Sequence, residues 1–331
     1  MADKRSKQLI PLALILCSII TFLSLRFGAV EYSIGQIWQA LREGAQSPGG
    51  AIFWYSRLPR TAGCLLAGAA LACSGCMLQS VLGNNLASPG VLGVNAGAGL
   101  AVTVCCACGA LSGWSISCAA FAGAMLAVLV VVLLARKTRA SRTTVILAGV
   151  AMNSMLGALR DAVTTLVPEA GMLSGEFRVG GFSAVVPARL LPAACLILTA
   201  LLVGLLMCTQ LDVLALGEDT ARSLGMAVER TRTVFLLLAA MLAGAAVSFA
   251  GLLGFVGLLV PHMARRLVGG ESRFLLPMSI LTGAGLVTAC DLTARVVFAP
   301  YELPVGILMS VMGGPFFLVL LLKGRGGRSH A

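Results

Sequence analysis

The chain has 331 residues, of which 58% are hydrophobic and 11% are charged, and its mean hydropathy is +0.96. Because soluble domains carry about 25% charged residues, this composition excludes a soluble enzyme or a nucleic-acid-binding module, despite a net charge of +11. An all-α polytopic membrane protein remains, and at about 20 residues per span the chain has room for about ten spans.

Stretches that lack Asp, Glu, Lys, Arg and His mark the predicted spans. The first begins at Gln8, after the basic residues Lys4, Arg5 and Lys7. No clear cleavage site follows it, so it is predicted to remain as the first helix. The stretch 61–135 is long enough for three helices. Gly, Asn and Pro at 83–90, and Gly at 109 and 113, predict where it breaks.

The stretch 233–261 decides the number of spans. As a single helix it would reach about 43 Å, which exceeds the ~30 Å hydrocarbon core of a bilayer. Gly251, Gly254 and Gly257 predict a break within it. The chain therefore has ten spans if this stretch forms two helices, and nine spans if it forms one.

The basic residues favour ten spans, because Lys and Arg concentrate in cytoplasmic loops. With the N-terminus inside, ten spans place 16 of the 24 Lys and Arg residues on the cytoplasmic side, whereas nine spans place 11 there. We therefore predict one membrane domain over 1–331, with both termini cytoplasmic. Its ten spans lie near 8–27, 59–82, 91–109, 114–135, 143–166, 189–210, 231–250, 252–267, 274–297 and 303–322.

Side chains that could perform chemistry are scarce. Asp161 and Asp291 are the only carboxylates near span interiors. Asp291 is followed four residues later by Arg295, so an ion pair within one helix is expected. No Ser-His-Asp set, paired catalytic carboxylates or metal-ligand cluster can be assembled. We therefore expect no enzymatic activity, no metal site and no cofactor in this chain.

Small residues are spaced for close helix packing. Gly68 with Ala72, and Gly93 with Gly97, have the four-residue spacing that lets membrane helices approach one another. Cys73 and Cys76 have CxxC spacing, as do Cys105 and Cys108, which raises a metal site as an alternative. Small thiols also pack well between membrane helices, and with no histidine nearby we favour packing.

The inner loop at 212–227 is more than a short basic connection. Its apolar residues share one face and two glycines divide it, which predicts two short amphipathic helices at the membrane surface. The segment lacks Lys and contains Glu218 and Asp219, so a protein partner fits better than a lipid surface. The apolar residues are Leu214, Leu216, Ala221 and Leu224, and the glycines are Gly217 and Gly225.

Ten motifs occur in a fixed order along the chain. They are RLPR at 57–60, GAALACSG at 68–75 with Gln79, LASP at 86–89, LGV at 92–94, LGE at 216–218, ARSLG at 221–225, GFVGL at 254–258, PH at 261–262 with Arg265, Asp291 with AR at 294–295, and ELPVG at 302–306. In this order they resemble the motifs of the FecCD-type permeases, the ten-helix membrane subunits of ATP-binding-cassette (ABC) importers for ferric siderophores, heme and cobalamin. The resemblance covers about residues 8–323. Two positions depart from the family pattern: Asn85 replaces the usual Pro, and Cys290 replaces the usual Ala.

The resemblance implies the type II ABC importer permease fold and a set of partners. These are a second permease, identical or related, two cytoplasmic ATPase subunits and an external substrate-binding protein, at the bacterial inner membrane. ATP and Mg would lie on the ATPase, since no GxxxxGK[ST] P-loop occurs in this chain. The matching residues for ATPase coupling are Leu216, Gly217, Glu218, Ala221, Arg222, Leu224 and Gly225.

Three arginines lie at the predicted outer ends of spans. Taken alone, Arg57 and Arg60 could snorkel to lipid head groups, and Arg295 could pair with Asp291. The resemblance instead implies that these three arginines form a basic pocket for glutamates of the binding protein. A guanidinium suits this role because it binds a carboxylate through two parallel hydrogen bonds.

Four amide side chains, Gln79, Asn84, Asn85 and Asn153, are the candidates for lining the translocation path. His262 lies beside Arg265 and Arg266, where we expect a polar contact at a helix end rather than an iron ligand.

Two functions are consistent with these features. The first is an ABC importer permease for an iron chelate, with a ferric siderophore expected before heme or cobalamin. The alternative is a secondary carrier or channel driven by an ion gradient. The 212–227 loop and the scarcity of buried ionisable groups favour the importer.

Overall fold

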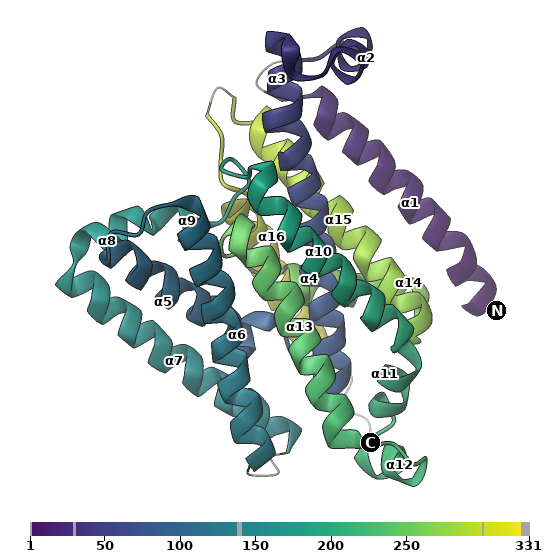
Figure 1. The fold of residues 1–331 in the computed structure, drawn as a ribbon. Helices are drawn as coiled ribbons and strands as arrows, with labels where there is room; N and C mark the ends of the chain where they lie inside the picture. The colour runs from purple at the N-terminus through teal and green to yellow at the C-terminus, as the bar shows by residue number, and fades with distance from the viewer. Residues whose placement is uncertain (1, 29–30, 138–140, 300, 326–331) are drawn as a thin grey trace.

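The computed structural model describes residues 2–28, 31–137, 141–299 and 301–325, and within these ranges the regular elements are all helical (Figure 1). The longer helices are α1 (Ala2–Arg26), α4 (Leu58–Leu82), α5 (Val94–Ala107), α6 (Gly113–Lys137), α7 (Arg142–Leu166), α10 (Pro187–Leu206), α13 (Val228–Ala250), α14 (Val256–Val268), α15 (Ser272–Val296) and α16 (Val305–Arg325). The shorter ones are α2 (Ile34–Glu43), η1 (Gly44–Gln46), α3 (Pro48–Ile52), η2 (Phe53–Arg57), η3 (Pro89–Leu92), α8 (Pro168–Leu173), α9 (Gly175–Val179), α11 (Cys208–Ala215) and α12 (Glu218–Ser223).

A helix occupies each of the ten predicted ranges, but the helices differ in length. Among the described residues, seven are long and apolar enough to cross a membrane. The apolar parts of α5 and α16 are shorter, and α14 is a 13-residue helix that carries Arg265 and Arg266. The all-α membrane fold is thus confirmed, and the number of ten crossings stays a prediction.

The predicted break within 233–261 is present as a non-helical segment at 251–255 between α13 and α14. Backbone bonds link this part of the chain to α9 and the residues after it: the Leu252 amide donates to the carbonyl of Phe177 in α9 at 2.9 Å. The amide of Gly181, just after α9, donates to the carbonyl of Ala250 at the end of α13 at 2.8 Å. Non-helical backbone inside a membrane protein requires such partners. Phe255, with φ of 62°, is the one described non-glycine residue with left-handed backbone.

Helix α4 lies at the centre of the bundle, against α13, α14 and α15. In the most apolar window of each stretch, 83% of residues are buried in Gly49–Leu82 but only 11% in α7. Gly68 faces the backbone of Gly283, and Gly75 faces the backbone of Gly257, so closely that a Cβ on Gly68 or Gly75 would overlap a carbonyl oxygen. The close packing predicted at Gly68 is therefore present.

The molecule has two distinct ends. Figure 1 shows α2 and α3 at one end, next to the start of α4, and α12 at the opposite end. Helix α10 ends at Leu206 and α11 begins at Cys208, earlier than the predicted boundary near 210. The stretch is uncharged up to Leu211, so hydropathy carries no signal of this break.

Candidate functional site

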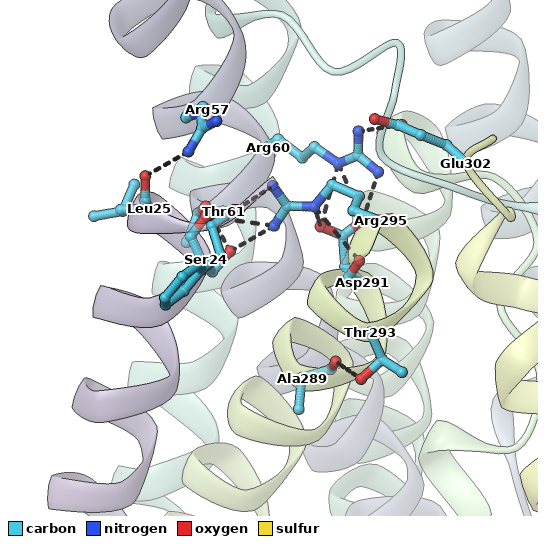
Figure 2. A network of polar contacts seen from close by, with 11 residues as sticks. Ser24, Leu25, Arg57, Arg60, Thr61, Ala289, Asp291, Thr293, Arg295 and Glu302 are labelled. Carbon is cyan, nitrogen blue, oxygen red and sulfur yellow. Dashed lines mark hydrogen bonds and ion pairs between the residues drawn. The ribbon is translucent and has the colours of Figure 1, made fainter. Parts of the chain in front are cut away.

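The three predicted arginines meet at the α3 end of the molecule (Figure 2). Arg57 is the last residue of η2, Arg60 lies in the first turn of α4, and Arg295 lies in the last turn of α15. The continuous run of helix from Pro48 through α4, together with the contact between α4 and α15, brings Arg60 and Arg295 to Asp291 and places Arg57 one turn away on the same run.

Asp291 is the common partner in this cluster, and its side chain is fully buried. It accepts hydrogen bonds from Arg60 Nε at 3.0 Å and from Arg60 Nη2 at 2.9 Å. Its other oxygen lies 2.9 Å from Nε of Arg295, which is the ion pair predicted from the sequence. The contact with Arg60 was missed by the sequence, because the two residues are 231 positions apart.

Arg57 and Arg295 are directed at the end of α1. Arg57 Nη1 donates to the carbonyls of Leu25 and Arg26, both at 2.9 Å, and Arg295 Nη2 donates to Ser24 Oγ at 2.8 Å. Cations at a helix C-terminus donate to carbonyls that lack intrahelical partners, and their charge interacts favourably with the negative end of the helix dipole. Arg57 is 6% exposed and Arg295 is 4% exposed. Snorkelling to lipid head groups is therefore the wrong interpretation of Arg57.

The remaining edge of Arg60 contacts Glu302. Arg60 Nη1 donates to Glu302 Oε2 at 2.7 Å, and the two side chains are 12% and 39% exposed. The sequence identified Glu302 only as part of a family motif. Its place beside Arg60 depends on the fold, because Glu302 lies between α15 and α16, far from α4 in the sequence.

At the opposite end, α11 and α12 are the two short helices predicted over 212–227. Gly217 and Gly225 both have left-handed backbone, with φ of 110° and 80°. The four apolar side chains of this segment do not share one environment. The side chains of Leu214 and Ala221 are buried in the bundle, whereas those of Leu216 and Leu224 are each 63% exposed.

Glu218 binds within the chain, whereas the sequence suggested that it faces a partner. Its carboxylate contacts Arg232 Nη2 on α13, lies 3.5 Å from Arg142 Nε on α7 and lies 3.9 Å from Arg222 Nη2 on α12. Arg142 also donates to the Leu214 carbonyl at 3.0 Å. Sequence reasoning missed both contacts: Arg232 follows this loop closely in the sequence, whereas Arg142 belongs to a separate basic cluster at 136–142.

A second link joins the short helices to α15. The Asp212 carboxylate accepts a hydrogen bond from the Ser272 amide at 2.8 Å and so caps the first turn of α15. The pair α11–α12 is thus held to α7, α13 and α15 by polar contacts of named side chains.

The predicted path residues surround the turn at 84–91. Arg265 Nη1 donates to Gln79 Oε1 at 3.0 Å and to Asn85 Oδ1 at 3.1 Å. Asn84 Oδ1 accepts from the Leu86 amide at 2.8 Å, and Asn153 Nδ2 donates to the Gly90 carbonyl at 2.7 Å. These four amides therefore shape the turn.

A cavity of about 290 Å³ lies between this turn and the unwound segment after α13. Pro89, Asn95, Phe255 and Phe317 are among its lining residues. Asn95 and Arg265 belong to this region of the chain but were not among the predicted path residues.

His262 does not make the expected contact at a helix end. It lies in the middle of α14, its ring packs edge-on against Phe316 at 5.9 Å, and its Nε2 is buried without a hydrogen-bond partner among the described residues. The expectation failed because the helix was predicted over 252–267 but α14 spans Val256–Val268, so His262 lies at its centre and not near its end.

Cys73 and Cys76 are buried in the core as free thiols.

Known proteins resemble the whole chain. A profile of the FecCD transport family matches residues 16–323. The hemin transport system permease protein HmuU of Yersinia pestis is 36% identical over 322 residues, which cover 96% of each chain. The ferric enterobactin transport system permease protein FepG of Escherichia coli is 34% identical over 308 residues, which cover 93% of each chain.

A solved structure has the same fold. It is an ABC transporter assigned to the metal-chelate type, in an inward-facing conformation, and it matches with a TM-score of 0.85 at 26% identity. The match covers 96% of this chain and 99% of the solved one. The chain therefore belongs to the FecCD transport family and is a multi-pass membrane permease.

Proposed function

We propose that the chain is the permease subunit of an ABC importer that carries an iron chelate across the bacterial inner membrane. A ferric siderophore is the first candidate, and heme or cobalamin follows. The observation that carries the proposal is the separation of two contact surfaces: the arginine cluster at the α3 end and the exposed leucines of α11–α12 at the α12 end. The hemin and ferric enterobactin named for two relatives support an iron chelate as cargo.

The α12 end is proposed to face the cytoplasm, with both termini, and to dock on an ATPase subunit. Leu216 and Leu224 expose apolar side chains there, and Arg222 is 57% exposed. Because Asp212 and Glu218 fasten these helices to α7, α13 and α15, a displacement of α12 by the ATPase would reach three helices of the bundle. This connection would couple ATP hydrolysis to movement of the permease.

The α3 end is proposed to dock the external binding protein. Its three arginines outnumber the two carboxylates beside them, the buried Asp291 and the part-exposed Glu302, so the cluster keeps a net positive charge. A carboxylate on the partner would complement this charge, which speeds association and fixes the orientation of docking. Arg60 gives the most direct test, because it is the arginine that contacts the part-exposed Glu302, whereas Arg57 and Arg295 bind α1. Since Arg60 also pairs with the buried Asp291, assembly with the ATPase is the check that a variant is still folded.

A second permease subunit is proposed to cover α7. This helix exposes Leu147, Met155 and Leu159 along its length, and α16 exposes Val311 and Leu318. An identical or related permease on these faces would leave the translocation path between the two subunits, next to the turn shaped by Gln79, Asn84, Asn85 and Asn153.

Uptake by reconstituted vesicles tests this function. The chain, its ATPase and its binding protein are placed in vesicles, and ATP-dependent uptake of a labelled ferric siderophore, hemin and cobalamin is compared. We expect one of the three to be taken up, and Arg60→Glu to abolish docking of the binding protein while assembly with the ATPase persists. Gradient-driven flux by the chain alone would instead support the secondary carrier and contradict the importer.

A further inference from the structure

We propose that Glu302 is an internal competitor for the docking site: it occupies the outer edge of the Arg60 guanidinium and must yield it to a carboxylate of the binding protein. This inference rests on the proposed docking role of the arginine cluster. It adds a residue that limits how tightly and how fast the partner binds.

The first argument is that Arg60 has only one edge to offer. Its Nε and Nη2 are both directed at Asp291, at 3.0 Å and 2.9 Å, and Asp291 is fully buried. Its Nη1 is directed at Glu302, at 2.7 Å. Figure 2 shows Asp291 and Glu302 on different sides of the Arg60 guanidinium. Because the N–H groups of a guanidinium point in fixed directions, the edge left for a partner is the one that Glu302 holds.

The second argument is that the other two arginines are committed elsewhere. Arg57 donates to the carbonyls of Leu25 and Arg26, and Arg295 is shared between Asp291 and Ser24. Both are nearly fully buried. They contribute positive potential to the surface, whereas Arg60 presents the donor that a partner can reach.

The third argument is that exchange at Arg60 is feasible. Glu302 is 39% exposed, so water can replace its contact, and exposed ion pairs are individually weak. A partner carboxylate would restore the same hydrogen bond. The backbone after Glu302 is held in place, because the Gly306 amide donates to the Gly180 carbonyl at 3.1 Å. The exchange then requires only a new side-chain rotamer for Glu302.

A competitor and a simple structural tie predict opposite effects. If Glu302 competes, Glu302→Gln removes the charge that holds Arg60 and the binding protein associates faster and more tightly. If Glu302 only fastens the segment before α16 to α4, the same change loosens the docking surface and weakens binding. Glu302→Asp keeps the charge on a shorter side chain and serves as a second variant.

The experiment uses the full transporter, permease with ATPase, in lipid nanodiscs, and its cognate binding protein as the probe. Association rate and Kd are measured at low and physiological salt for the wild type, Glu302→Gln and Asp161→Asn. Asp161 is a matched control, because it is a 67% exposed carboxylate near the end of α7 that pairs with Arg160 rather than Arg60. It reports the effect of removing one negative charge from the surface.

We expect Glu302→Gln to lower Kd about 3- to 10-fold, mainly through a faster association rate, while Asp161→Asn stays within about 2-fold of the wild type. A Kd for Glu302→Gln that is equal to the control or higher than the wild type would overturn the competition. Arg60→Glu separates this failure from that of the proposed function. If Arg60→Glu loses docking while it still assembles with the ATPase, the docking surface stands whatever Glu302 does, and if its docking is normal, both proposals fall.

Discussion

Each end of the molecule holds a carboxylate among arginines, but the two carboxylates differ in how deeply they are buried. At the α3 end, the carboxylate of Asp291 is fully buried between Arg60 and Arg295. At the α12 end, the carboxylate of Glu218 faces three arginines but remains 31% exposed. Glu218 therefore has more arginine partners than Asp291, but its carboxylate is also accessible to water.

Burial matters more than the number of partners. Removal of one member of a buried ion pair leaves a charge that water cannot reach, whereas an exposed pair is screened and its loss costs little. We conclude that Asp291 fastens α4 to α15 permanently, while Glu218 holds α12 by contacts that can be exchanged. A coupling helix that responds to an ATPase needs contacts of the second kind.

The comparison is tested most severely by Asp291→Asn. The change leaves Arg295 buried without a carboxylate and leaves Arg60 with only Glu302, and we expect a loss of about 3–5 kcal/mol in the free energy of unfolding. Thermal unfolding of the purified permease measures it. Asp161→Asn, at an exposed pair with Arg160, is the control and should cost about 0–1 kcal/mol. Equal stability of the two variants would mean that burial does not distinguish these pairs.

The glycines around α12 should be next in effect. Gly217→Val and Gly225→Val place a β-branched residue where φ is 110° and 80°, and nothing lies within 4 Å of either added Cβ. We expect a cost of about 1–3 kcal/mol from backbone strain alone, with ATP hydrolysis no longer linked to uptake. Gly270→Val is the control, because Gly270 has open space around it and no positive φ. Tight coupling in both variants would show that α12 is not the coupling element.

Glu218→Gln should have a smaller effect on stability. With its carboxylate already 31% exposed, we expect a cost of about 1 kcal/mol, and uptake per ATP hydrolysed should fall about 5-fold because α12 is held less firmly. Asp219→Asn removes an exposed neighbouring charge and should leave that ratio unchanged. If both variants transport normally, the three arginine contacts are not needed for coupling.

The smallest effect is expected from Arg60→Lys. Lysine keeps the charge towards Asp291 and Glu302 but loses the planar fork, so docking of the binding protein should weaken about 3- to 10-fold. The affinity of the wild type should also fall as salt rises, because exposed charges are screened within ~8 Å at physiological ionic strength. A titration of the binding protein at two salt concentrations measures both effects, and a salt-independent Kd would contradict docking by charge.

The sequence predicted the long helices well because the signals for each helix lie in residues that are close together in the sequence. The uncharged stretches, the glycines at 251–257 and the divided loop at 212–227 are local signals, and helices or breaks occur at these places. The short helices α2, α3, α8 and α9 were not predicted. Helices α3, α8 and α9 have only five or six residues and give no clear period, whereas α2 begins with a capping box of Ser33 and Gln36 that could have revealed it.

The site was predicted only in part, because its geometry depends on residues far apart in sequence. The sequence placed Arg57, Arg60 and Arg295 at one end, and the ion pair of Arg295 with Asp291 followed from their four-residue spacing. It did not show that Arg57 turns inward to α1 or that Arg60 shares Asp291. Those contacts require the packing of α1, α4 and α15, which no local pattern encodes.

The close approach of α4 to its neighbours also limits how the permease can move. Where Gly68 meets Gly283 and Gly75 meets Gly257, carbonyl oxygens occupy the space that a Cβ would need, so a sliding or rotation that brought a larger residue to these points would cause a collision. Helices α4, α14 and α15 should therefore travel as one rigid body during the transport cycle. Conformational change must arise at its margins, and spin labels on α4 and α15 should keep one distance while labels on α7 and α4 report two.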